Sequence, residues 1–437
     1  MLPSATLPAS LAVLLAALEP CFTAPTFRTF CALVTGLVAQ TGPRTVCGML
    51  VGAGLSRVWG HDRAHRFFSA ARWSPEQLGV RLAVLVVSLL VAPGAPVLVA
   101  VDDTLFRRSG KKVWAASWFH DGSAVGPKKV GFGNNWVITG IVVTLPFINR
   151  PVCLPVLARL VVKNTTSASR LWLARRMVED LARALPDRQI HVVADAAYAG
   201  RELRGLGERI TWTTRLRRDA ALFELAPPAT GTRGRPRLKG ARLPCLATLG
   251  HTLAFTPTTV SRYGATTTVH TATITCLWYS VFGSRPVRVV LLRESGHRGY
   301  QLALVSTDTT ATPAQIIGRY AARWSIEVAI EDAKQLFGVG QARNRRAAAV
   351  RRTVPFALTT QSLTMLWYAT AGHHPTDAAE HREHAPWYLT KTQPSTADMI
   401  AKLRRVLIAT RFRASHPDQP TPAEIHALRL AWDSDAA

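Results

Sequence analysis

The strongest constraint on the fold is a series of apolar segments with the composition of buried β-strands. Residues 97–103, 134–147 and 152–162 are rich in Val and Ile, and residues 188–195 repeat the pattern. Before that last segment, residues 167–185 place apolar side chains at helical spacing. Three strands, a helix and a further strand are the order of an α/β fold, which is the fold class we predict.

Two of these expected strands end in acidic residues. Asp102 and Asp103 close the first, and Asp195 closes the last. Ligands of open α/β sheets bind beside strand ends, so we expect a functional site where these carboxylates meet. Side chains alternate along a strand, and therefore only one of Asp102 and Asp103 can face that site.

A helix is predicted over residues 312–337. Thr312 is its expected N-cap, Pro313 suits the first helical position, and Gln315 completes a capping box. Most of the following positions are apolar or small, which indicates a helix that is packed on most sides.

One narrow polar stripe interrupts this apolar helix. At about 100° per residue, Tyr320, Arg323, Glu327, Glu331 and Lys334 fall on the same face. Carboxylates in a mostly buried helix need a partner, because burying an unpaired charge is costly. Arg323, four residues before Glu327, can provide it, and so can a metal ion.

The acidic residues of the strands and of this helix form an all-oxygen donor set. Such a set suits Mg²⁺ or Mn²⁺. Two such ions about 4 Å apart activate a water or a 3′-hydroxyl and stabilise the departing oxygen in phosphodiester chemistry. We therefore expect a two-metal site.

The charge of the chain indicates a polyanionic partner. It carries 53 Lys and Arg against 27 Asp and Glu over 437 residues, a net charge of +26 with a pI near 11.0. Such an excess favours nucleic acid as the partner. Two basic runs, residues 232–242 and 343–352, are candidate DNA contacts.

In the first basic run, Arg233 and Arg235 belong to an Arg-Gly-Arg-Pro segment similar to the core of an AT-hook. A solvated loop that touches phosphates without sequence preference is the alternative interpretation. In the second run, Arg345 and Arg346 follow the expected acidic helix, and we expect them to contact phosphates.

The compartment is expected to be the cytoplasm, with the protein associated with the nucleoid. The six cysteines have no zinc-ligand spacing and are typical of reduced thiols. Residues 82–101 are uncharged and long enough to span a bilayer, but Pro93 and Gly94 interrupt them. A buried helix, a turn and a buried strand explain them better.

The residues then match a known family. The chain resembles bacterial insertion-sequence transposases of the DDE type, which have an RNase H-like catalytic core. The group it resembles carries a Tyr-x2-Arg-x3-Glu-x6-Lys signature, and Tyr320, Arg323, Glu327 and Lys334 meet its spacings. Asp-Asp-Thr at 102–104 and VVAD at 192–195 are similar to the family's two other acidic motifs. The resemblance covers roughly residues 20–412.

This resemblance implies the roles of individual residues. Asp103, Asp195 and Glu327 would be catalytic and would hold the divalent metal. The aspartate before Thr is the family's catalytic one, which selects Asp103 over Asp102, while Glu331 is a modest rival of Glu327. The signature residues Tyr320, Arg323 and Lys334 would hold phosphates at the transposon end.

The family also implies a domain order and a candidate base-stacking residue. The expected parts are a helical region at 1–92, the first part of the core at 93–204, a β-rich insertion at 205–308, a core helix at 309–340 and a helical region at 341–437. Some members stack a Trp of the insertion on a flipped base. Trp278 is our candidate and Trp212 the runner-up, and a core Trp in a strand is an equally open interpretation.

The function expected from these features is DNA transposition. A homodimer would bind the element's terminal inverted repeats and target DNA, cut with metal-activated water and join the 3′-hydroxyl to the target. Two alternatives stay open. One is a domesticated, metal-dependent nuclease of the same fold that cuts without joining, and the other is a DNA-binding protein in which the carboxylates only balance Arg.

Overall fold

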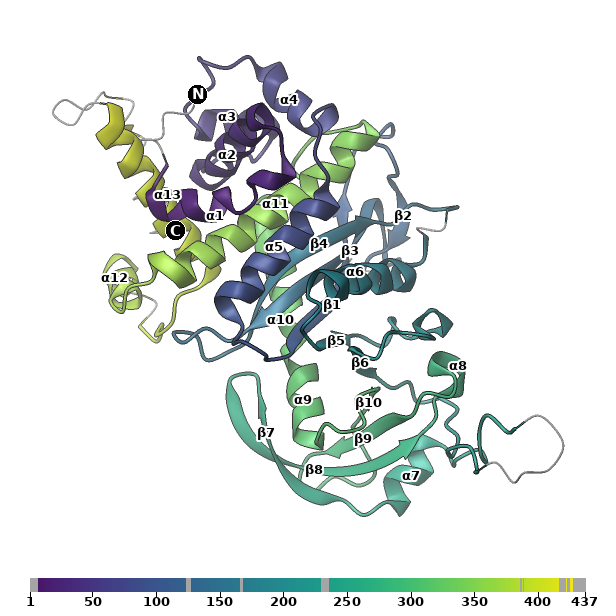
Figure 1. The fold of residues 1–437 in the computed structure, drawn as a ribbon. Helices are drawn as coiled ribbons and strands as arrows, with labels where there is room; N and C mark the ends of the chain where they lie inside the picture. Colours follow the sequence, from purple (N-terminus) through teal and green to yellow (C-terminus); the bar gives the residue numbers. More distant parts are fainter. Residues whose placement is uncertain are drawn as a thin grey trace.

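The computed structural model describes residues 7–122, 127–165, 168–228, 236–385, 387 and 389–415, together with 422, 425 and 426. Its strands form one mixed sheet in the order β2-β3-β1-β5-β6-β10-β9-β8-β7, with β4 paired to β3 beside this path. Helices cover the sheet around β1 and β3, whereas the part around β7 and β8 is more open (Figure 1). The α/β fold class predicted from the sequence is therefore confirmed.

The strand bounds are as follows: β1 (Val97–Arg107), β2 (Ser117–His120), β3 (Val130–Val143), β4 (Val152–Leu160), β5 (Ile190–Ala194), β6 (Ile210–Arg215), β7 (Thr256–Arg262), β8 (Ala265–Cys276), β9 (Val287–Arg293) and β10 (Leu302–Ser306). The helices before β6 are α1 (Ala9–Ala16), α2 (Ala24–Ala39), α3 (Val46–Gly52), α4 (His61–Ser69), α5 (Pro75–Leu90) and α6 (Arg170–Ala184). Those after it are α7 (Leu246–Thr252), α8 (Tyr279–Phe282), α9 (Pro313–Ala322), α10 (Trp324–Gln335), α11 (Ala347–Trp367), α12 (Asp377–His384) and α13 (Thr396–Ser415).

The centre of the sheet is built from the segments that the sequence marks as strands. β1 runs parallel to β5 and antiparallel to β3, and β5 runs parallel to β6. Residues 97 and 99–101 of β1 are buried, as expected for a central strand covered on both faces. The parallel alignment brings the end of β5 beside the middle of β1.

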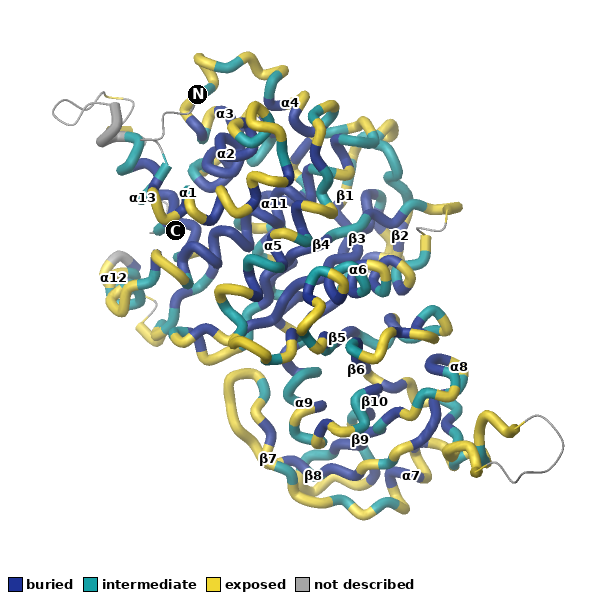
Figure 2. Tube along the Cα trace, viewed as in Figure 1, coloured by how far each residue is buried: buried dark blue, intermediate teal, exposed yellow. Residues whose placement is uncertain are grey.

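The N-terminal helices pack with α11 over one side of this sheet. Residues 353–367 of α11 are all buried, and Figure 2 shows this helix as one of the most enclosed elements of the molecule. The uncharged segment 82–101 forms the end of α5, a turn in which Gly94 has a φ of 74°, and the start of β1. Within the described ranges, no helix combines the length and apolar composition needed to cross a bilayer.

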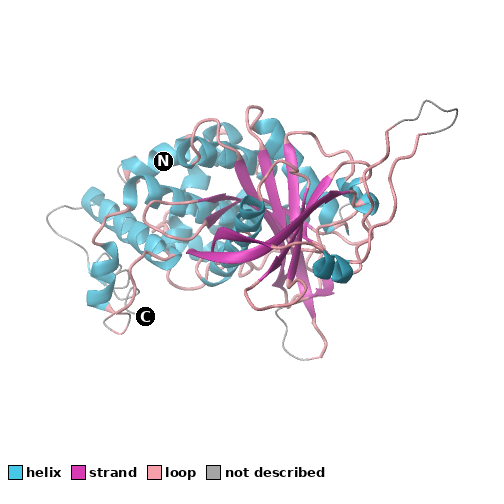
Figure 3. Ribbon diagram, turned by 90° about the horizontal axis from the view of Figure 1, so that it is seen from below, coloured by secondary structure: helices cyan, strands magenta, loops and turns pink. Residues whose placement is uncertain are grey.

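The β-rich segment after β6 extends the same sheet rather than forming a separate one. The connection is an antiparallel ladder in which Leu304 pairs with Arg215 and Ser306 with Thr213. A second, smaller core lies against α9 and includes Val260, Val269 and Ile316. Seen from below, the strands form one twisted layer with most helices gathered on one side (Figure 3).

The single helix expected over residues 312–337 is divided into α9 and α10. The capping box of Thr312 and Gln315 is confirmed. The division falls at Arg323, whose φ of −54° and ψ of −35° remain helical. Ser325 Oγ donates a 2.7 Å hydrogen bond to the carbonyl of Ala322, and such side-chain bonds compete with the helical ladder.

Candidate active site

The register of two parallel strands determines which acidic side chains share a face. Val101 of β1 lies opposite Ala194 of β5, so that the next residues, Asp102 and Asp195, come level with each other. Asp195 itself follows the last residue of β5, and its carboxylate accepts a 2.8 Å hydrogen bond from the Ala197 amide. The charge of Asp195 is also among the influences that raise the pKa of Asp102. Asp102 and Asp195 therefore face a common space.

Arg323 connects this strand carboxylate to the acidic helix. Its Nη1 lies 3.5 Å from Oδ2 of Asp102, and its Nη2 lies 2.6 Å from Oε1 of Glu327. The pairing of Arg323 with Glu327, expected from their spacing, is confirmed. Among the described residues, no acceptor reaches the buried Nε of Arg323. The guanidinium thus bridges two carboxylates and retains one donor for a further acceptor.

Negative charge exceeds positive charge in this buried space. Burial, together with the charges of Asp103 and Asp195, raises the pKa of Asp102 to about 7, against the opposing effects of a hydrogen bond from the Asp103 amide and of the charge of Arg323. Burial disfavours the charged form of Arg323, but Glu327 outweighs burial and raises its pKa. Arg323 is thus held as a cation beside carboxylates that it only partly neutralises.

Asp103 points to the opposite face of β1. Its carboxylate accepts hydrogen bonds from Asn135 Nδ2 at 3.0 Å and from Tyr198 Oη at 3.1 Å, and Arg170 Nε lies 3.1 Å away. The reason is the alternation of side chains along β1, which continues past this position to Arg107. Resemblance selects Asp103, but in the structure it is Asp102 that lies on the same face of β1 as Glu327. Asp102 is therefore a second candidate beside Asp103, the residue that the resemblance selects.

Asn135, Arg170 and Tyr198 are site residues that sequence reasoning missed. They hold Asp103 directly behind Asp102, and Tyr198 is 1% exposed. The one available signal was the Asn-Asn pair at 134–135, a polar interruption within an apolar strand pattern. Arg170 and Tyr198 carry no such signal, because their positions depend on how α6 and the turn after β5 meet β1.

The other signature side chains, Tyr320 and Lys334, lie near Arg323 and near β1 respectively. The ring centroid of Tyr320 is 5.7 Å from the Arg323 guanidinium carbon. Lys334 Nζ lies 5.8 Å from the ring centroid of Phe106 in β1, and burial lowers the pKa of this lysine. Glu331 is exposed and accepts a hydrogen bond from the Gln335 side chain. Of the acidic residues in α10, Glu327 is therefore the one that Arg323 joins to β1.

The donor set fits a hard divalent cation. Asp102, Asp195 and Glu327 offer only oxygen ligands, which Mg²⁺ and Mn²⁺ prefer. Arg323 lies between Asp102 and Glu327, so that these carboxylates are held apart by a side-chain cation.

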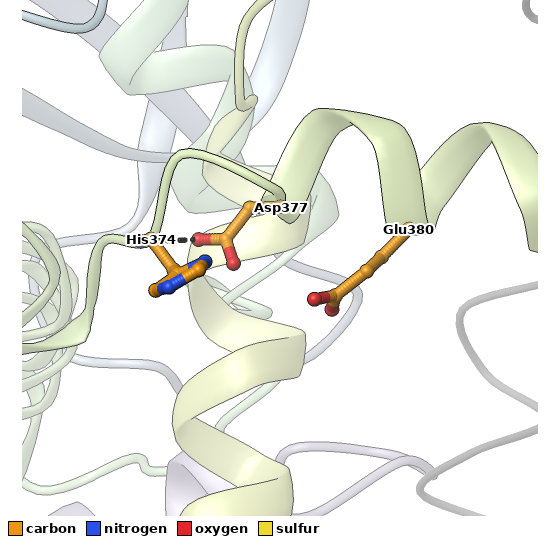
Figure 4. Close-up of side chains that lie close together, drawn as sticks. All are labelled: His374, Asp377 and Glu380. Atoms are coloured by element: carbon orange, nitrogen blue, oxygen red, sulfur yellow. Dashed lines mark hydrogen bonds between the residues drawn. The ribbon is translucent and has the colours of Figure 1, made fainter.

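A more compact group of potential metal ligands lies elsewhere. In the part of the chain that the structure describes, His374, Asp377 and Glu380 have ligand atoms within 4.8 Å of one another (Figure 4). Asp377 accepts hydrogen bonds from the His374 amide at 3.0 Å and from Tyr368 at 2.5 Å, and it forms an ion pair with Lys402. These contacts explain the group as the start of α12, and we assign no metal to it.

The structure describes the second of the two basic runs expected to contact DNA, but not all of the first. Arg345 and Arg346 are exposed and directly precede α11. Arg233 and Arg235 lie outside the described residues.

Both candidates for base stacking lie in the interior of the protein. Trp278 is 5% exposed and packs against Phe282, with ring centroids 6.1 Å apart. Trp212 is fully buried, and its indole nitrogen donates to the carbonyl of Tyr198 at 3.0 Å. Both rings are part of the hydrophobic core, which agrees with the alternative interpretation of a core Trp.

Comparison with known proteins identifies the family of the chain. The fold and the site define an α/β chain that gathers carboxylates from two strands and a helix. The family model of the DDE superfamily endonucleases matches residues 17–285, and the chain belongs to this family. The match ends before α9 and α10, so the assignment of Glu327 depends on spacing and geometry. No curated protein matches the chain.

One solved structure similar to the chain is the piggyBac transposase in a synaptic complex with hairpin DNA. The sequence identity is 12% and the TM-score is 0.40, over 94% of this chain and 78% of that chain.

Proposed function

We propose that the protein is a DNA transposase. It would cut phosphodiester bonds at the ends of its own element and join the freed 3′-hydroxyl to target DNA. The observation that carries this proposal is the arrangement of Asp102 and Asp195 on one face of the sheet, with Arg323 joining Asp102 to Glu327. Membership of the DDE superfamily endonucleases supports the same chemistry.

In this proposal, Asp102, Asp195 and Glu327 hold two Mg²⁺ or Mn²⁺ ions. The ions, when bound, activate the attacking hydroxyl and stabilise the leaving oxygen. Asp103 acts as a positioning residue, because Arg170 and Tyr198 fix it directly after Asp102 on β1.

The cationic signature residues are proposed to hold the DNA backbone. Arg323 is held as a cation beside Asp102 and Glu327, and guanidinium groups form strong charge-assisted hydrogen bonds with phosphate oxygens. Lys334 and Tyr320 extend this polar path along α9 and α10. The net charge of +26 supports double-stranded DNA as the partner. We propose that the terminal repeats are bound by a homodimer.

The proposal is tested on a supercoiled plasmid that carries the element's ends, in the presence of Mg²⁺. Wild-type protein should cleave the ends and join them to target DNA. The Glu327→Gln variant should do neither but should bind the ends normally, since its basic contacts are unchanged. Normal strand transfer by this variant would overturn the proposal.

The second candidate is a metal-dependent nuclease that cuts without joining, which the endonuclease family also supports. The same plasmid assay separates the two. Cleaved ends that never appear covalently joined to target DNA, even at long times and high protein concentration, would favour the nuclease.

A further inference from the structure

A large arginine-lined cavity lies next to the candidate active site. It has a volume of about 780 Å³ and is formed by residues 41–45, by the end of β1 with the residues after it, and by residues 340–345. Five of its lining residues are arginines: Arg44, Arg107, Arg108, Arg343 and Arg345. No Asp or Glu is among the described residues that line it. The cavity is therefore a strongly positive space, and we call it the arginine pocket.

Several donors in the arginine pocket have no acceptor. Within the described part of the chain, Arg44 Nε, Arg108 Nη2 and Asn344 Nδ2 are buried without a hydrogen-bond partner. Unsatisfied buried donors of this kind cost about 1–3 kcal/mol each. Because the protein itself shields these three atoms from solvent, it is the positive charge of the arginines that the cavity presents to an anionic ligand. Arg343 and Arg345 add exposed positive charge at the rim.

The pocket wall is held in place by contacts across the fold. Arg108 donates from Nε to Asn134 Oδ1 at 3.0 Å and from Nη1 to the carbonyl of Gly340 at 2.9 Å. The amide of Arg44 donates to Gln341 Oε1 at 2.7 Å. The N-terminal helical region and the segment after α10 therefore form one fixed wall. The charge of Arg107 is partly neutralised, because its Nη2 lies 2.9 Å from Oδ2 of Asp121.

The arginine pocket continues the line of the signature residues. Lys334 lies over the ring of Phe106, and a Cβ on Gly340 would meet the same ring at 3.3 Å. Arg107 follows Asp102 by five positions along β1. At about 3.3 Å per residue this places the pocket roughly 17 Å from the carboxylates. Duplex DNA rises 3.4 Å per base pair along its axis, so this distance corresponds to about five base pairs for a duplex that runs along β1.

We propose that the arginine pocket binds a backbone phosphate of duplex DNA about five base pairs from the bond that is cut. The inference rests on the proposed function, because it takes the carboxylates as the cutting site. Arg44 makes the N-terminal helical region part of this contact. The pocket thereby sets the register of the duplex, since phosphate contacts fix position along DNA without reading its sequence.

The test measures binding of a 40-base-pair duplex to the full chain by fluorescence anisotropy, in EDTA and over a range of salt concentrations. The Arg343→Ala/Arg345→Ala double variant removes the two exposed rim charges. Each lost phosphate contact should reduce the slope of log K against log salt by about 0.9 and weaken binding about five-fold at 150 mM salt. The matched control is Arg218→Ala/Arg298→Ala, which removes two exposed arginines outside the pocket.

A second variant tests the contribution of the N-terminal region. Arg44→Met keeps the apolar stem that packs on the turn at Gly338 but removes the charge. We expect a reduction of the slope by about 0.9. The thermal unfolding midpoint should equal or exceed that of wild type, because the buried Nε without an acceptor is removed. A slope equal to that of the control for both variants would overturn the proposal. The proposal would also be overturned, in favour of a free anion as the ligand, by the following result. Pyrophosphate raises the unfolding midpoint of wild type and of the control but not of the pocket variants, and the pocket variants bind DNA as wild type does.

These outcomes are separate from those of the plasmid assay. If the pocket variants lose salt dependence but Glu327→Gln still cuts DNA, the pocket stands and the assigned cutting site is wrong. If wild type cuts and joins DNA while the pocket variants bind like the control, only the pocket proposal fails.

Discussion

The two adjacent aspartates of β1 should respond oppositely to the same substitution. Burial and the neighbouring carboxylates raise the pKa of Asp102 from its ordinary value of 3.8 to about 7. A carboxyl group whose pKa is higher in the folded than in the unfolded protein destabilises the folded state when the pH exceeds the unfolded pKa. The cost grows with pH until the pH passes the folded pKa. At 1.36 kcal/mol per pH unit, the cost of ionised Asp102 at pH 8 is at most about 4 kcal/mol.

Asp102→Asn removes this cost in the metal-free protein. The amide oxygen can still accept the 2.8 Å hydrogen bond from the backbone of Asp103, and Arg323 keeps Glu327 as its partner. We expect the thermal unfolding midpoint in EDTA to rise by a few degrees at pH 8. At pH 5 the gain should fall to about 2 kcal/mol or less, because Asp102 is then mostly protonated in the folded state.

Asp103→Asn should instead destabilise the protein. The carboxylate accepts from Asn135 and Tyr198 and pairs with Arg170, and an amide group would place a donor against one of these donors. The expected loss is about 1–3 kcal/mol, from one disrupted hydrogen bond and one lost ion pair. The two variants carry the same chemical change at neighbouring positions, so each is the control of the other.

Scanning calorimetry in EDTA and then in Mg²⁺ measures both effects. Mg²⁺ should raise the unfolding midpoint of wild type and of Asp103→Asn, but not of Asp102→Asn, because a ligand that binds only the folded state stabilises it. The reasoning is refuted if Asp102→Asn lowers the midpoint at pH 8. It is equally refuted if Asp103→Asn alone abolishes the response to Mg²⁺.

Three further predictions concern other parts of the molecule. Lys334→Ala should reduce the salt slope of DNA binding by about 0.9, and an unchanged slope would remove its role as a phosphate contact. Burial opposes ionisation of Asp308, but hydrogen bonds from Arg319 and Thr310 outweigh it and lower its pKa to about 2. Its stabilising effect is thus present above about pH 4 and lost as the pH falls to 2, so Asp308→Asn should cost about 1–2 kcal/mol of unfolding free energy at pH 7 and almost nothing at pH 2; equal losses would contradict this. Trp278→Leu should lower the unfolding midpoint by the equivalent of about 2–4 kcal/mol without weakening DNA binding, whereas normal stability with defective cleavage would restore a base-stacking role.

Local patterns were sufficient for much of the site. The α/β order follows from segments whose periodicity and composition are local properties, and the division of residues 82–101 into helix, turn and strand follows from Pro93 and Gly94. The Arg323–Glu327 ion pair is a contact between positions four apart on one helix, so its geometry is set by helical periodicity. The capping box at Thr312 has the same local origin.

Long-range packing decided the rest. Period-two alternation requires Asp102 and Asp103 to face opposite ways, but only the packing of α10 against β1 decides which of them meets Glu327. The meeting of Arg44 with residues after α10 likewise joins positions that are far apart along the chain. Spacing along a chain determines contacts within one element, whereas contacts between elements depend on which faces are buried together when the whole core forms.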